Sequence, residues 1–220
     1  MNPSQTGKFL FAIVALFAIP FPRAQADDFD SSGDYVRPSR PGFHAVERLG
    51  ITLGGSTISK VTHQDGAIRE ITAGGLYQIG LGVLYQADAI PLSAALTLNY
   101  HYNSDYNNNN NASFRRIPLE ALAYFNGMNP FRVGGGMRYI YAARANADLN
   151  GVSERITFEN TRGSVVEIGY QVTPYGWVNL RYVKETYKVA TYATTGTTPV
   201  VSGMPPYNGS HVGLFITYEY

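Results

Sequence analysis

The final nine residues of the chain, Val212-Gly-Leu-Phe-Ile-Thr-Tyr-Glu-Tyr220, alternate between two kinds of side chain. One parity is apolar or aromatic throughout, at Val212, Leu214, Ile216, Tyr218 and Tyr220. Successive side chains of a β-strand point to opposite faces, so the segment predicts a strand with one apolar face that ends in aromatic rings. This pattern is typical of a strand in a membrane barrel, where apolar side chains face lipid and aromatic rings lie at the water boundary.

Seven earlier segments show the same alternation. With the C-terminal segment, the predicted strands are 48–56, 77–86, 92–102, 116–125, 131–141, 165–172, 177–184 and 212–220. Their apolar parity meets a charge only at strand ends, at Glu47 and Lys184. A lipid-facing Arg or Lys in the middle of a bilayer costs about 2–4 kcal/mol, so this pattern indicates contact with hydrocarbon. The predicted fold is all-β, an eight-stranded antiparallel up-and-down transmembrane β-barrel.

Short and long connections alternate between the predicted strands. The short ones are 87–91, 126–130 and 173–176, and the long ones are 57–75, 103–115, 144–163 and 190–210. A membrane barrel has short periplasmic turns and long outer loops, so both termini are expected on the periplasmic side. Within the long loops, the asparagine run 107–111 is expected to stay mobile. The fourth loop is expected to be either unstructured or a binding surface for a host or envelope partner.

The N-terminal segment carries an export signal. Lys8 precedes about a dozen apolar residues, and Ala24-Gln25-Ala26 provides a small-residue cleavage site. We therefore expect a cleaved signal peptide over 1–26, a flexible periplasmic leader over 27–44 and the barrel over 45–220. Removing Lys8 and Arg23 leaves 15 basic and 16 acidic residues, a net charge of −1 that gives no indication of a nucleic-acid partner. The chain has no cysteine, so it has neither a disulfide framework nor a thiol nucleophile.

Four stretches of this chain resemble the small eight-stranded outer-membrane barrels, the superfamily of the OmpA-like transmembrane domain and its opacity-protein and Ail-like relatives. They are the glycine-rich 132–139, Arg116–Glu120, Pro174–Tyr182 and the aromatic C-terminus. The resemblance implies the outer membrane of a Gram-negative-type bacterium, with outer-membrane lipid, lipopolysaccharide and the barrel-assembly machinery as partners. It also implies that the last strand is an assembly signal, carried by Leu214, Ile216, Tyr218 and Tyr220.

Charged residues on the opposite parity point into the predicted barrel. Glu120, Arg138, Glu167 and Arg181 lie at similar mid-barrel height and predict a paired network. Because side chains can fill the interior of an eight-stranded barrel, this network is either the polar core of a plugged barrel or a gate that passes small solutes.

A catalytic role has little support in the sequence. A hydrolase needs a histidine, an acid and a hydroxyl at one site, and the candidate pairs are His101 with Ser104 and His211 with Ser210. We expect these histidines to be rim or loop residues, with no catalytic site, metal or cofactor. The predicted function is a structural or surface-interaction role through the outer loops. The alternatives are a narrow conduit for small solutes or apolar molecules and, more remotely, a lipid-modifying enzyme.

Overall fold

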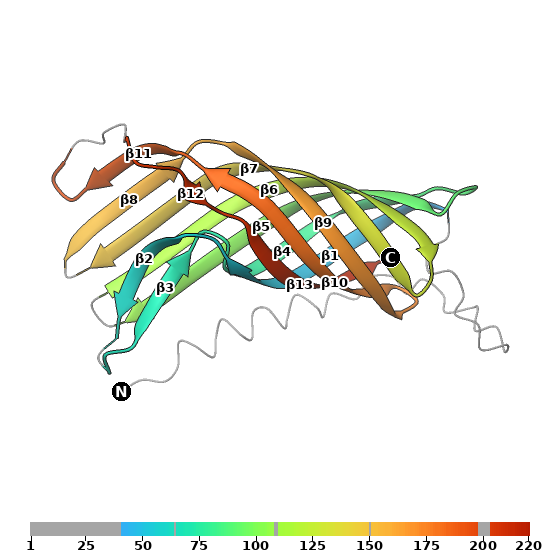
Figure 1. Cartoon of the computed structure of the whole chain (residues 1–220), viewed down its shortest axis with the longest axis horizontal. Coiled ribbons are helices and arrows are strands. Elements are labelled where there is room, and N and C mark those ends of the chain that lie inside the picture. The colour runs from blue at the N-terminus through green and yellow to red at the C-terminus, as the bar shows by residue number, and fades with distance from the viewer. Residues whose placement is uncertain (1–40, 64, 108–109, 150, 198–202) are drawn as a thin grey trace. The chain divides into compact units, whose positions relative to one another are not determined.

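The computed structural model describes residues 41–63, 65–107, 110–149, 151–197 and 203–220. Within these ranges, eight antiparallel strands form a closed barrel, which confirms the predicted fold (Figure 1). Its strands are β1 (Gly42–Gly54), β4 (Leu76–Gln86), β5 (Leu92–Asn107), β6 (Asn110–Met128), β7 (Phe131–Leu149), β9 (Thr161–Thr173), β10 (Gly176–Tyr187) and β13 (His211–Glu219). No helix among the described residues is long and apolar enough to cross a membrane.

Each strand of the barrel pairs with its neighbours in chain order, and β13 pairs with β1 to close the ring. The predicted signal peptide and leader residues 27–40 lie outside the described residues. β1 begins at Gly42, so the last three residues of the predicted leader are already in the strand. They pair with the C-terminal end of β4, with Phe43 opposite Tyr85. The barrel therefore begins slightly earlier than the sequence pattern suggests.

The parity predicted from the sequence separates the two faces of the barrel wall. In the seam between β1 and β13, Leu49 lies opposite Ile216 and Ile51 lies opposite Leu214. Leu214 exposes 57% of its surface, whereas its chain neighbour Phe215 exposes none. A shift of one residue would exchange these two faces, so the apolar outer surface fixes the register.

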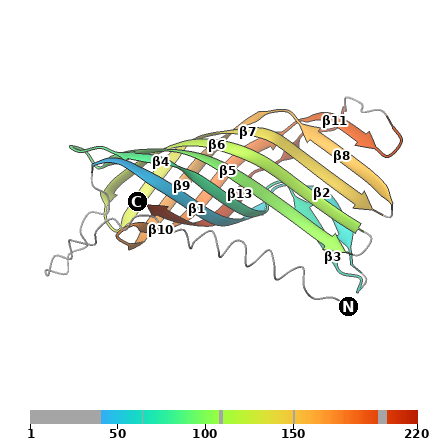
Figure 2. The same ribbon diagram turned by 180° about the vertical axis from the view of Figure 1, so that it is seen from behind.

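The predicted outer loops are largely β-structure, which corrects the boundaries expected from the sequence. The additional strands are β2 (Thr57–Thr62), β3 (Ile68–Thr72), β8 (Val152–Phe158), β11 (Val189–Thr194) and β12 (Tyr207–Asn208). β2 and β3 form a hairpin, and β8 pairs with the outer part of β7 and with β11. These elements project from one end of the barrel, and the C-terminus lies toward the other end (Figures 1 and 2). We call them, with the outer ends of β5, β6 and β7, the outer extension.

The asparagine run 107–111, of which residues 108 and 109 lie outside the described residues, differs from the expectation at its described positions. Asn107, Asn110 and Asn111 lie in paired strands, and β6 continues alongside β7 as far as the pair Asn110 and Leu149. Pairing persists here because the outer extension has an apolar core of its own. The buried residues of that core are Val61, Ile71, Ala73, Ala112, Phe114, Ile140, Ala143, Ala145, Ala147, Ile156, Phe158, Tyr187 and Val189.

The strand faces exchange their polarity on passing from the barrel into the outer extension. Inward positions of β6 change from Glu120 and Arg116 to Phe114, and the outward positions change from Ile117 to Arg115. The same exchange occurs on two more strands. Outward Tyr141 is followed by Arg144 on β7 and outward Tyr182 by Lys184 on β10, while the inward positions become Ala143 and Tyr187. We call this level the polarity inversion.

Candidate functional site

The structure brings together the four lumen residues that the sequence pattern selects. Arg181 Nη1 lies 2.8 Å from Glu120 Oε2, and Arg181 Nη2 lies 2.5 Å from Glu167 Oε2. Arg138 Nε lies 3.5 Å from the other oxygen of Glu120. All four side chains are fully buried, so the barrel is closed to solvent at these groups.

Strand register is the reason these charges meet. β6 places Glu120 directly opposite Arg138 on β7, and β9 places Glu167 directly opposite Arg181 on β10. Directly opposed side chains of an antiparallel pair lie about 4.5–5.5 Å apart at Cβ, which is within reach of an ion pair. Arg181 then connects the two registered pairs across the lumen by contacting both glutamates.

The network is larger than the sequence pattern indicates. Arg48 Nη1 lies 3.3 Å from Glu120 Oε2, and Arg132 forms an ion pair with Glu219. Glu185 pairs with two arginines, since its Oε1 lies 3.5 Å from Arg116 Nη2 and its Oε2 lies 3.4 Å from Arg138 Nε. Among the described residues, the buried charges are therefore five arginines and four glutamates. Arg116 is the first residue of the predicted strand 116–125, and Glu185 lies one residue beyond the predicted strand 177–184. Both share the inward parity of Glu120 and Arg181, so extending that parity to the strand ends would have found them.

Aromatic rings fill the space between the ion pairs. The guanidinium carbon of Arg181 lies 4.5 Å from the ring centre of Phe215, and that of Arg132 lies between Tyr124 and Trp177 at 4.4 and 4.1 Å. The Phe215 ring lies against Gly50, where a side chain would collide with it. The arginines are thus held by carboxylates at their edges and by rings over their faces, an arrangement that packs the lumen as a polar core.

The inward histidines do not form a catalytic pair. Arg116 Nη2 donates to His101 Nδ1 at 2.7 Å, so in a neutral imidazole the proton is on Nε2, which lies 2.8 Å from Thr52 Oγ1. Nε2 therefore donates to Thr52 and cannot accept its proton as a general base would. A hydrolase would need a carboxylate, rather than a guanidinium, at Nδ1.

The second predicted pair is also separated. His211 uses Nδ1 to donate to the Gly209 carbonyl at 2.8 Å, while Ser210 Oγ contacts the Glu185 carbonyl at 3.5 Å. Within the described ranges, no group of three or more His, Cys, Asp or Glu side chains could hold a metal ion. The absence of catalysis and of a metal remains a prediction.

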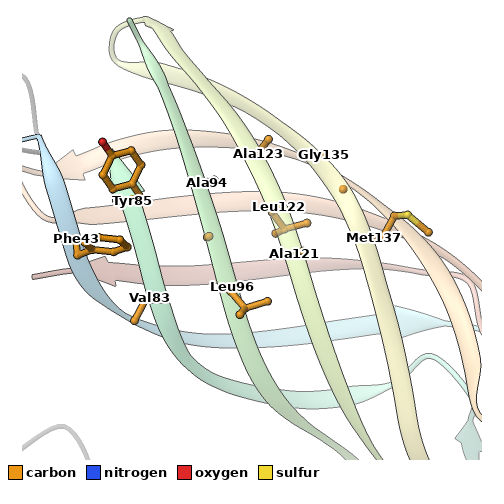
Figure 3. A pocket seen from close by; sticks show the side chains of 12 residues that line it. Phe43, Val83, Tyr85, Ala94, Leu96, Ala121, Leu122, Ala123, Gly135 and Met137 are labelled. Carbon is orange, nitrogen blue, oxygen red and sulfur yellow. The ribbon is translucent and has the colours of Figure 1, made fainter. Parts of the chain in front are cut away.

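The outward surface has a shallow groove of about 570 Å³ across β4 to β7 (Figure 3). Small outward residues, Ala94, Ala121, Ala123 and Gly135, form its floor, and larger side chains such as Tyr85 and Met137 form its rim. The groove is almost wholly apolar and lies on the face that a membrane barrel presents to hydrocarbon. It is therefore a depression in the lipid-facing wall and not an entrance to the lumen.

The β2–β3 hairpin is attached to the barrel by polar contacts. His63 Nε2 lies 2.5 Å from Asp105 Oδ2, Asn103 Nδ2 donates to the Thr72 carbonyl at 3.2 Å, and Arg116 donates to the carbonyl of Ala73. At the exposed surface of the hairpin, hydrogen bonds from Lys60 and Thr57 lower the pKa of Glu70 below its usual value. The hairpin also buries Val61 and Ile71 in the apolar core of the outer extension.

The predicted assembly signal lies on the outer surface of the last strand. Leu214, Ile216 and Tyr220 expose 57%, 45% and 41% of their surface, and Tyr218 is partly exposed and stacks near Tyr220. Their side chains are therefore directed away from the lumen, where hydrocarbon or a partner strand can reach them. Their role in assembly remains a prediction.

Solved structures share this architecture. Neisserial surface protein A (NspA) superposes with a TM-score of 0.50 at 16% sequence identity, covering 81% of this chain and 97% of that chain. Ail of Yersinia pestis gives a TM-score of 0.46 at 10% identity, with coverage of 82% and 100%. OprG from Pseudomonas aeruginosa gives a TM-score of 0.45 at 13% sequence identity, covering 84% of this chain and 99% of that chain. No protein-family model and no curated protein sequence matches this chain. The closed ring of strands and its likeness to NspA show that this chain has the fold of the small eight-stranded outer-membrane barrels.

Proposed function

We propose that the protein is exported to the outer membrane of a Gram-negative-type bacterium, where the barrel is a closed scaffold that holds the outer extension at the cell surface. The polarity inversion is the observation that carries this proposal. Below it, apolar side chains face outward and charges face inward, as a barrel surrounded by hydrocarbon requires. Above it, apolar side chains face inward, as they do in a protein surrounded by water.

The packing of side chains in the lumen favours a closed scaffold over a conduit. Its charges are ion-paired, and Arg116, Arg132 and Arg181 also stack on aromatic rings. Arg138, Arg181 and Glu120 expose at most 1% of their surface. A gate would need these groups to separate, which would leave charges without partners in the barrel interior. Breaking one partner of a buried ion pair typically costs about 3–5 kcal/mol.

The outer extension supports a surface-interaction role, with a host or envelope partner. It is a built structure with its own core, so it can present a fixed surface from a rigid scaffold. β11 lies at one end of the paired sheet, and an edge strand can accept an added strand from a partner. In this proposal the barrel-assembly machinery recognises β13 through Leu214, Ile216, Tyr218 and Tyr220.

Single-cysteine labelling tests the placement in the membrane, because the chain has no native cysteine. The variants are Asn111→Cys in the outer extension, Leu119→Cys on the outward face of β6 and Asp88→Cys in the turn after β4. With a membrane-impermeant maleimide, we expect Asn111→Cys to react in intact cells and Asp88→Cys only after the outer membrane is permeabilised. Leu119→Cys should react only after denaturation. Rapid labelling of Leu119→Cys in the folded protein would overturn the proposal.

Conductance in planar bilayers tests the closed scaffold separately. We expect the wild-type protein to show no steady channel openings, and Arg138→Ala to create unstable ones by breaking the ion pairs to Glu120 and Glu185. Steady openings of the wild-type protein would instead favour a conduit for small solutes. Heat-dependent gel mobility of both proteins would establish that each barrel is folded.

A further inference from the structure

A group of outward cations lies immediately above the polarity inversion. It consists of Arg115 on β6, Arg144 on β7, Arg162 on β9 and Lys184 on β10, and we call it the outer cation band. These strands are neighbours in the barrel wall, so the band covers one continuous face. The side chains of Arg115, Arg162 and Lys184 are exposed and that of Arg144 is partly exposed.

Strand register groups the cations of this band into two pairs. Arg115 lies directly opposite Arg144 in the β6–β7 ladder. On the adjacent pair of strands, Lys184 lies opposite Ser164, two residues from Arg162, and this places Lys184 diagonal to Arg162. Like charges directly opposite each other destabilise a sheet, so the Arg115–Arg144 pair needs a compensating anion.

The described part of the chain offers these cations no carboxylate. No ion pair joins Arg115, Arg144, Arg162 or Lys184 to an acidic side chain within the described ranges. The lumen arginines differ sharply, since Arg48, Arg132 and Arg181 all contact glutamate. The described residues therefore do not supply the anion that would compensate the outer cation band.

The band is confined to one side of the barrel. At the outer ends of β1, β4 and β13, the outward positions are Leu53, Tyr77 and Val212. A general electrostatic belt at the membrane surface would surround the barrel. Cations at this level on β6, β7, β9 and β10 indicate a site with a defined face.

Tyrosines lie beside two of the cations in the strand ladders. Tyr102 lies opposite Arg115, and Tyr139 lies opposite Arg162. The ring of Tyr139 packs edge-on against that of Tyr141 with 4.5 Å between their centres, just before Arg144 along β7. Aromatic rings at this level belong to the interfacial layer of a membrane, so the cations beside them lie within reach of lipid headgroups.

We infer that the outer cation band binds the phosphate groups of a phosphorylated glycolipid in the outer leaflet, with Arg115 and Arg144 sharing one phosphate. The planar guanidinium group suits phosphate because it can donate two parallel hydrogen bonds to it. The bound phosphate would replace the repulsion between the two arginines with two attractive contacts. This inference rests on the proposed placement of the barrel in the outer membrane.

The test compares the full-length mature protein in phosphatidylcholine nanodiscs with and without diphosphorylated lipid A. We expect lipid A to raise the melting temperature of the wild-type protein and to be retained on it in native mass spectrometry. The double variant Arg115→Ala/Arg144→Ala should retain about ten-fold less lipid A, because each charge-assisted contact contributes appreciably to binding. In phosphatidylcholine alone, the same variant should melt no lower than the wild-type protein, since a repulsive pair has been removed.

Two further variants distinguish the site from charge in general. Lys60→Ala/Arg69→Ala removes two cations from the β2–β3 hairpin and should retain lipid A as the wild-type protein does. Arg115→Lys/Arg144→Lys keeps the charge without the planar donors and should give intermediate retention. Heat-dependent gel mobility and Trp177 fluorescence would show that each variant is folded.

Three outcomes would overturn the inference. These are unchanged lipid A retention by Arg115→Ala/Arg144→Ala, an equal stabilisation of the protein by millimolar inorganic phosphate, and preferential binding of a soluble sulfated polysaccharide to the band in lipid A nanodiscs. If the cysteine labelling places the barrel in the membrane and the lipid A result fails, only this inference is lost. If the labelling itself fails, the proposed function is lost with it.

Discussion

The barrel and the outer extension are built by the same strands but have opposite interiors. Within the barrel, β6 directs Glu120 and Arg116 inward, whereas in the outer extension it directs Phe114 and Ala112 inward. The surroundings explain the difference. Hydrocarbon accepts the apolar face of the barrel and leaves charges for the lumen, while water accepts the polar face of the outer extension and leaves apolar side chains for its core.

This comparison shows that strand alternation alone does not determine which face is the core. Alternation tells which side chains share a face, and the solvent outside decides which face points inward. In the proposed placement, the residue at which the two patterns exchange therefore marks the level of the membrane surface on each strand. On β6 that level lies between Ile117 and Arg115, and on β10 it lies between Tyr182 and Lys184.

The largest effect is expected from breaking the barrel interior. Arg181→Met removes the arginine that makes the shortest ion pairs to both Glu120 and Glu167, and we expect the free energy of unfolding to fall by about 3–5 kcal/mol. Urea unfolding in lipid vesicles, followed by the fluorescence of Trp177, measures this change. Arg69→Met makes the same substitution on the exposed face of the hairpin and should change stability by less than about 0.5 kcal/mol. Equal effects of the two substitutions would contradict a buried network.

Phe114→Ala should disrupt the apolar core of the outer extension. Phe114 is buried and packs edge-on against Phe158 and Tyr187, so its loss should cost about 3 kcal/mol or more. Because the barrel has a separate interior, we expect local opening rather than global unfolding. Hydrogen exchange should accelerate in β8 and β11 and stay slow in β13. Phe125→Ala, on the outward face of the same strand, should leave exchange in β8 and β11 unchanged, and the comparison fails if both variants behave alike.

The exterior of one strand provides a sharper test of the boundary. Leu119→Arg places a cation in the proposed hydrocarbon zone and should destabilise the protein by about 2–4 kcal/mol. Asn111→Arg places the same residue outward on β6 beyond the polarity inversion, where the expected change is within about 0.5 kcal/mol. The free energy of unfolding of each variant in lipid vesicles measures the two changes. If Asn111→Arg were as harmful as Leu119→Arg, the boundary on β6 would be misplaced.

The smallest effect is expected at the exposed surface of the β2–β3 hairpin. The hydrogen bonds that lower the pKa of Glu70 favour its charged form, so they stabilise the hairpin above the pKa of the unfolded chain and are lost as the pH falls through the folded value. Glu70 and Lys60 are both exposed, and exposed pairs contribute little. Glu70→Gln should therefore leave the melting temperature unchanged at pH 7. A clear decrease would show that the hairpin depends on this pair.

The sequence predicts the barrel well because its apolar parity is uninterrupted across the membrane. Glu120, Arg138, Glu167 and Arg181 can be placed at one height by counting along strands, and the structure brings them into contact. Glu185 is harder to find, because it follows Lys184, where the outward parity turns polar. If hydrocarbon is assumed to surround the whole strand, the polar residue at Lys184 is interpreted as the end of that strand.

The sequence pattern predicts loops over the outer extension for the same reason. Its strands direct apolar residues such as Ala145 and Ala147 inward and polar residues such as Asn146 outward, the reverse of the barrel pattern. Alanine and asparagine are also weak strand formers, so their composition did not indicate β-structure. Pairing with neighbouring strands and a shared core decide the structure here, and neither can be read from one segment alone.

The seam between β1 and β13 has a consequence for how the molecule is made. Val46 to Gly54 pair with Glu219 to His211, so the first strand of the ring cannot find its second partner until the last residues of the chain are available. Contacts between residues so distant in sequence form slowly, since a long stretch of chain must first be brought into a closed loop. Along the proposed export route, the nascent polypeptide would cross the periplasm with its apolar face unpaired, so we expect it to need a chaperone that prevents aggregation until the ring closes.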